Sequence, residues 1–192
     1  MRKLAHEEIV ARQVIRCRAS RIPLTVVLDN IRSLHNVGSI FRTADGIGVE
    51  KIWLCGITGY PPKTDIAKTA LGAEESVAWE FEPNVLKAVT VMKATGYEIV
   101  MLEQVEGAIS YEAYSPKRSV CLVIGNEVEG ISDEIVALCD CAIDIDMLGV
   151  KNSLNVAVAF GVVGFHLRNR LGSLRRGNPL HIQNSGLTKE IV

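Results

Sequence analysis

Short apolar runs alternate with longer, more polar segments along this chain of 192 residues. Runs rich in β-branched and other apolar residues, bounded by Gly, Pro or polar residues, predict buried strands. The segments between them predict helices, several with a Gly or Pro at one end. The predicted strands are 24–29, 51–56, 97–103, 119–125 and 141–147, and the predicted helices are 4–19, 36–48, 83–96, 132–140 and 153–171.

This alternation predicts an α/β fold with a mostly parallel sheet covered by helices, because the strands are apolar on both faces. We expect a single domain over 1–171, with a short basic helix at about 1–23 and a polar tail at 172–192. The segment 57–76 is predicted to be loop-rich. Ligands of such sheets bind beyond the carboxyl ends of the strands. The loops that follow the carboxyl ends of the predicted strands are 29–36, 56–70, 103–110, 125–131 and 146–152.

The net charge of −1 hides an uneven distribution of charge. Residues 1–51 and 146–192 each carry an excess of four positive charges, and residues 52–145 carry an excess of nine negative charges. Charge runs of this kind form solvated faces, or here a basic surface for a polyanion. The arginine content favours the second interpretation, since Arg binds phosphate through two hydrogen bonds. These arginines form two groups, one near each end of the sequence: Arg16, Arg18 and Arg21, and Arg168, Arg170, Arg175 and Arg176.

Several function classes lack their sequence signals. The longest apolar run, 156–165, is half the length of a membrane span, and the N-terminus has no apolar signal core, so we expect a cytoplasmic protein. The five cysteines fit neither a disulfide framework nor a zinc site, and Cys55 and Cys121 are expected in the core. No dinucleotide fingerprint, P-loop or metal-ligand spacing is present, so no metal is predicted.

Three motifs stand at predicted strand ends: "NVGSIFRTAD" (36–45), "IGNEVEGIS" (124–132) and "MLGVKNSLNVAVA" (147–159). Each has a structural and a functional interpretation. Asn36 either caps a helix or serves a site, and Arg42 is either a surface charge or a ligand-binding group. Gly125 allows a ligand to approach the backbone closely, and Ser153 is the expected cap of the last helix.

The three motifs, in this order and spacing, resemble the SpoU/TrmH-type RNA 2′-O-ribose methyltransferases of the SPOUT superfamily. The resemblance runs from about Val26 to Arg170 and departs from many members at Asp146, where they have proline. It implies a C-terminal trefoil knot, a homodimer with a shared active site, and S-adenosylmethionine as cofactor. By matching position, it implies a catalytic group of Asn36, Arg42, Glu127, Ser153 and Asn155. The cofactor would contact Gly125, Ile145 and Leu154, with Leu102, Glu103 and Met147 completing the pocket.

The resemblance implies methyl transfer to a ribose 2′-hydroxyl of tRNA or rRNA. Arg42 would be the base or would clamp the phosphate that accepts the proton, since a guanidinium rarely loses its own. We expect Arg42 to be buried. Asn36, Glu127 and Asn155 would hold it in position. A non-catalytic RNA-binding protein on the same fold and a small-molecule enzyme are the alternatives. The short segment before the first strand favours tRNA over rRNA.

Overall fold

Seven parallel strands form one sheet in the order β3-β2-β1-β6-β4-β7-β5, which confirms the predicted parallel α/β fold. The computed structural model describes residues 1–17, 21–126 and 128–177, with side chains described outside 13–17 and 173–177. The strands are β1 (Ile22–Asp29), β2 (Val49–Cys55), β3 (Trp79–Glu82), β4 (Glu98–Leu102), β5 (Ile109–Ser110), β6 (Val120–Ile124) and β7 (Cys141–Asp144).

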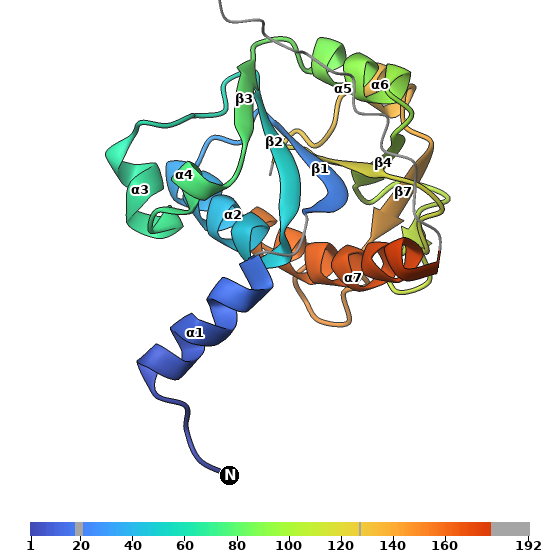
Figure 1. Cartoon of the computed structure of the whole chain (residues 1–192). Coiled ribbons are helices and arrows are strands. Elements are labelled where there is room, and N and C mark those ends of the chain that lie inside the picture. Colours follow the sequence, from blue (N-terminus) through green and yellow to red (C-terminus); the bar gives the residue numbers. More distant parts are fainter. Residues whose placement is uncertain (18–20, 127, 178–192) are drawn as a thin grey trace, which may run out of the picture.

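Helices lie on both faces of this sheet, and α1 extends away from it (Figure 1). The helices are α1 (His6–Cys17), α2 (Leu34–Ile47), α3 (Thr64–Ala70), α4 (Ala73–Ser76), α5 (Val85–Ala94), α6 (Asp133–Val136) and α7 (Val156–Gly177). The last helix therefore continues six residues past Leu171, where its apolar periodicity was expected to end. None of the described helices is long and apolar enough to cross a membrane.

The sheet divides the core into two layers. One face packs against α2, α3, α4 and α7 through residues such as Leu28, Phe41 and Phe160, all fully buried. The other face packs against α5 and α6 and includes Cys55 and Cys121, which confirms their place in the core. Strands buried on both sides explain why the sequence shows continuous apolar runs rather than alternation.

Four elements, two helices and two strands, were not predicted from the sequence. The segment 57–76 contains the helices α3 and α4, although Pro61-Pro62 does keep its first part irregular. The strands β3 and β5 were missed because both are short and lie at the edges of the sheet, where only one neighbour pairs with them.

Helix α3 packs closely on α2 at Gly38, where a Cβ would clash with the carbonyl oxygen of Ile66.

Candidate functional site

The strand order changes direction between β1 and β6, since β2 lies on one side of this pair and β4 on the other. In a parallel sheet, this point opens a crevice at the carboxyl ends of the strands. The loop that follows β1 leads into α2, which carries the first motif, and the chain that follows β6 carries the second. The fold therefore brings these two motifs together at one edge of the sheet.

Two asparagines that sequence reasoning missed join these loops. The Nδ2 of Asn126, which is 5% exposed, donates to the carbonyl oxygen of Asn30 at 2.9 Å. The Oδ1 of Asn126 accepts from the backbone N–H groups of Val128 and Glu129, at 2.8 and 3.1 Å, and so shapes the second-motif turn. Asn30 adopts a left-handed conformation with φ of 57°. An asparagine tolerates this conformation better than most residues, a signal visible in "LDN" at the end of the first strand.

The first and third motifs meet through a hydrogen bond between two predicted catalytic residues. The Nδ2 of Asn155 donates to the Oδ1 of Asn36 at 3.1 Å. The Oδ1 of Asn155 accepts from the backbone N–H of Ala157 at 3.0 Å, so Asn155 caps helix α7. One amide therefore fixes the start of α7 and ties it to the first turn of α2.

Both predicted helix caps were placed wrongly by a few residues. Helix α2 begins at Leu34, and its cap is Ser33, whose Oγ accepts from the backbone N–H of Asn36. Helix α7 begins at Val156 and is capped by Asn155 rather than by Ser153, which is exposed in the preceding loop. Asn, Asp and Ser cap helices about equally well, so residue type could not choose between neighbouring candidates.

Arg42 is exposed, which corrects the expectation that it is buried. No hydrogen bond or ion pair joins its guanidinium to any residue that the structure describes. Arg42 precedes Gly46 by one helical turn, and a Cβ at Gly46 would touch the ring of Phe165 on α7. Arg42 therefore lies beside the outer side of α7, on a different face of α2 from Asn36.

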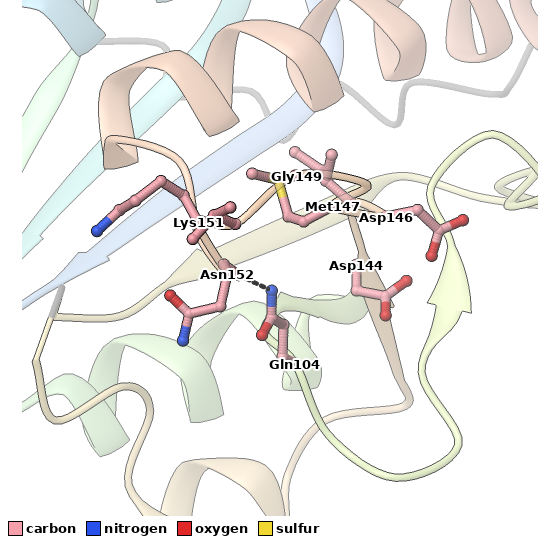
Figure 2. Close-up of a pocket in the computed structure, with 9 residues that line it drawn as sticks. Gln104, Asp144, Asp146, Met147, Gly149, Lys151 and Asn152 are labelled. Atoms are coloured by element: carbon pink, nitrogen blue, oxygen red, sulfur yellow. Dashed lines mark hydrogen bonds between the residues drawn. The ribbon is translucent and has the colours of Figure 1, made fainter.

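The third-motif loop forms a cavity of about 320 Å³ beyond the ends of β4 and β7 (Figure 2). This volume falls within the range of small-molecule sites. Ile145 and Met147, two of the predicted cofactor contacts, line it. The Nε2 of Gln104 donates to the carbonyl oxygen of Asn152 at 2.6 Å and holds the loop across the cavity. The lining consists of Gln104, Asp144, Ile145, Asp146, Met147, Gly149, Val150, Lys151 and Asn152.

The other predicted cofactor residues surround this cavity without lining it. Leu102 ends β4 and pairs with Ile143 of β7, and the backbone N–H of Glu103 donates to the carbonyl oxygen of Ile143. Leu154 is 38% exposed, two residues beyond the lining. Gly125 is buried, and a Cβ there would lie 2.7 Å from the backbone carbon of Gly130. The small size of Gly125 thus serves the packing of its own turn, and its contact with a ligand stays a prediction. Glu127 lies outside the described residues.

The described cysteines are not suited to nucleophilic chemistry. Burial raises the pKa of Cys55 to about 12 and the pKa values of Cys139 and Cys141 to about 11, with a smaller contribution from nearby carboxylates. A thiol with such a pKa stays protonated near neutral pH and is a poor nucleophile. Among the described residues, no group of three or more His, Cys, Asp or Glu side chains is arranged to hold a metal ion.

Three of the arginines from the basic ends of the chain bind its own body. Arg21 lies 3.7 Å from Asp45 and donates to the carbonyl oxygen of Ser76. Arg168 and Arg170 donate to the carbonyl oxygens of Gly46 and Glu112. The side chains of Arg16, Arg18, Arg175 and Arg176 lie outside those described. A basic surface built from both ends therefore stays a prediction.

Comparison with known proteins matches residues 23–165 to the SpoU rRNA Methylase family. The chain belongs to this family. It is 32% identical to the tRNA (guanosine(18)-2′-O)-methyltransferase of Thermus thermophilus over 147 residues, which cover 77% of this chain and 75% of the relative.

Two solved structures of relatives have the same fold. The A. aeolicus TrmH/SpoU tRNA modifying enzyme superposes with a TM-score of 0.74 at 27% identity, covering 88% of this chain and 85% of that one. The AdoMet-bound rRNA methyltransferase from Sinorhizobium meliloti has a TM-score of 0.72 at 28% identity, covering 76% of this chain and 56% of that one. The family assignment made from the three motifs is confirmed.

Proposed function

We propose that this SpoU-family protein is an S-adenosylmethionine-dependent methyltransferase that modifies a ribose 2′-hydroxyl of tRNA. The observation that carries the proposal is the continuity of the third motif. The loop that lines the cavity, up to Asn152, leads within three residues to Asn155, which binds Asn36 of the first motif. The third motif thus links a small-molecule cavity to two of the predicted catalytic residues, Asn36 and Asn155.

The residues of the cavity suit this cofactor, and S-adenosylmethionine would supply a methyl group on a positively charged sulfur. Ile145 and Met147 offer apolar contacts for a flat aromatic group, and Gln104, Asp144 and Lys151 offer polar ones. Glu103 and Leu154 border the loop. The knot implied by the family would hold this loop in place and stays a prediction.

The predicted catalytic residues have complementary tasks. A 2′-hydroxyl is a weak nucleophile and must lose its proton as it attacks. Arg42, exposed and without a described partner, is free to bind an RNA phosphate through two parallel hydrogen bonds, and an oxygen of that phosphate accepts the proton of the 2′-hydroxyl. Asn36 and Asn155 fix the ribose, with Ser153 in the adjoining loop, and the second motif contributes Glu127.

The names of relatives that match over most of their length favour tRNA over rRNA. The alignments with the Thermus tRNA methyltransferase and the A. aeolicus tRNA modifying enzyme cover 75% and 85% of those chains. The Escherichia coli relative, 32% identical over 160 residues, is also named a tRNA (guanosine(18)-2′-O)-methyltransferase. These similarities support tRNA as the substrate class.

We expect the purified protein to transfer labelled methyl groups from S-adenosylmethionine to unmodified tRNA and not to naked rRNA. The measurement is incorporation of label into each RNA at equal mass, with boiled protein as the control. Labelling of rRNA in preference to tRNA would contradict the choice of tRNA and keep the methyltransferase assignment. If neither RNA is labelled, the choice of tRNA and the methyltransferase assignment are both contradicted.

We also propose that the active site is completed by a second copy of the chain. Helix α7 exposes three apolar side chains on one face at helical spacing: Val158 is 52% exposed, Val162 36% and Phe165 45%. This face adjoins Arg42 through the contact of Gly46 with Phe165. A second α7 packed here would bury the face and bring Arg42 toward the cavity of the partner subunit.

Val158→Glu is expected to convert a dimer into a monomer, because it places a charge within the proposed apolar contact. Light scattering should give about twice the chain mass of 20.9 kDa for the native protein and that mass itself for the variant. Val91→Glu is the matched control, since Val91 is 42% exposed on α5 at the opposite face of the sheet. A native monomer that methylates RNA would contradict the proposal.

A further inference from the structure

An exposed aromatic ring lies in the loop that follows β2. Tyr60 is 40% exposed. Its ring packs on Phe81, with ring centroids 4.5 Å apart, and on Trp79, at 6.3 Å. The two supporting rings belong to β3 and fix the orientation of Tyr60 while part of it remains open to solvent. A tyrosine held in this way is a rigid apolar platform.

This platform adjoins the predicted catalytic helix. Gly59 packs directly on the side chain of Leu34, the first residue of α2 and two positions before Asn36. Farther along, the Oγ1 of Thr69 donates to the carbonyl oxygen of His35 at 3.0 Å. The segment 59–69 therefore wraps around the first turn of α2, beside the Asn36–Asn155 pair.

The electrostatics at Tyr60 favour an anionic ligand. The ammonium group of Lys63 lies 5.9 Å from the centre of the Tyr60 ring, and no ion pair joins Lys63 to a carboxylate among the described residues. The nearby acids on β3 are already neutralised, Glu80 by Lys51 at 2.5 Å and Glu82 by Lys87 at 2.7 Å. An aromatic ring beside a cation that no described carboxylate pairs with is the arrangement that binds a nucleobase and its phosphate.

We infer that Tyr60 and Lys63 form a contact site for the RNA substrate, in which a base next to the methylated nucleotide stacks on Tyr60 and its phosphate binds Lys63. This inference rests on the proposed function. The site positions the target strand rather than taking part in the chemistry, since neither side chain reaches the cavity lining. It therefore governs RNA affinity, and methyl transfer at saturating RNA does not depend on it.

Tyr60→Leu is expected to raise the KM for tRNA roughly tenfold, because stacking on one aromatic ring contributes about 1–3 kcal/mol. The value of kcat and the affinity for S-adenosylmethionine should not change, since leucine still covers Phe81 and Trp79. Tyr60→Phe keeps the ring and should behave like the native protein. Tyr97→Leu is the control, since it removes a tyrosine that directly precedes β4, at the amino ends of the strands and away from the motifs.

Lys63→Gln gives an independent measurement that does not disturb the ring. It should reduce the slope of log KM for tRNA against log salt concentration by about one, the loss of one phosphate contact. The inference is overturned if Tyr60→Leu leaves the KM for tRNA unchanged, if Tyr60→Phe is as defective as Tyr60→Leu, or if Lys63→Gln keeps the native slope. Native protein that methylates no RNA in the same assay would instead contradict the proposed function.

Discussion

Arg42→Lys should lower the single-turnover rate of tRNA methylation by at least about a hundredfold, the low end for loss of general acid–base assistance. Lysine keeps the positive charge but cannot bind a phosphate through two parallel N–H groups. The affinity for S-adenosylmethionine and the melting temperature should stay near their native values. Arg42 is exposed and has no bond to a described residue, and surface substitutions of this kind change stability by at most about 0.5 kcal/mol.

This combination separates a catalytic arginine from one that holds the site together. A structural arginine would lower the melting temperature and cofactor affinity along with the rate. Arg118→Lys is the matched control, because Arg118 is also exposed and pairs with Asp140 near the start of β4, away from the motifs. An Arg42→Lys protein that methylates tRNA at nearly the native rate would rule out the catalytic role.

Asn155→Ser should lower the methylation rate at least about tenfold and leave the melting temperature almost unchanged. Serine caps a helix about as well as asparagine, so the start of α7 is preserved. Its shorter side chain cannot reach the Oδ1 of Asn36, so the bond between the third and first motifs is lost. Displacement of the reacting groups lowers the rate of methyl transfer and does not change the stability of the fold.

Asn155→Ala removes both functions of the side chain and completes the comparison. Loss of the cap costs about 1 kcal/mol, which lowers the melting temperature by roughly 2–4 °C in a chain of this size. The rate should fall as it does in Asn155→Ser. Two results would contradict this division between capping α7 and binding Asn36. One is an equal melting temperature for Asn155→Ala and Asn155→Ser, and the other is native activity in Asn155→Ser.

The sequence predicted the parts of this fold that depend on continuous patterns. Five of the strands follow from apolar runs such as "VCLVI", because a strand buried on both faces needs apolar residues at every position. The ends of α2 and α7 were shifted because Ser33 and Asn36, or Ser153 and Asn155, are equally good caps by residue type. Tertiary contacts made the choice, since Asn155 also binds Asn36.

The site was less predictable than the fold because its residues meet only through the sheet topology. Asn30 and Asn126 are 96 positions apart in sequence and become neighbours because β1 pairs with β6. Gln104 and Lys151 reach the cavity from loops whose shapes no periodicity encodes. Arg42 is exposed because it lies off the apolar face of α2, and that face packs in the core of the same chain through residues such as Ile40 and Phe41.

The central claim is that the methyl group goes to a ribose oxygen, and analysis of the nucleosides from the product tRNA tests it most directly. The tRNA is methylated with labelled S-adenosylmethionine, digested to nucleosides and analysed by mass spectrometry with fragmentation at the glycosidic bond. We predict that the added mass of the labelled methyl group stays with the ribose fragment and that the base fragment is unmodified. A labelled base with an unmodified ribose would contradict it.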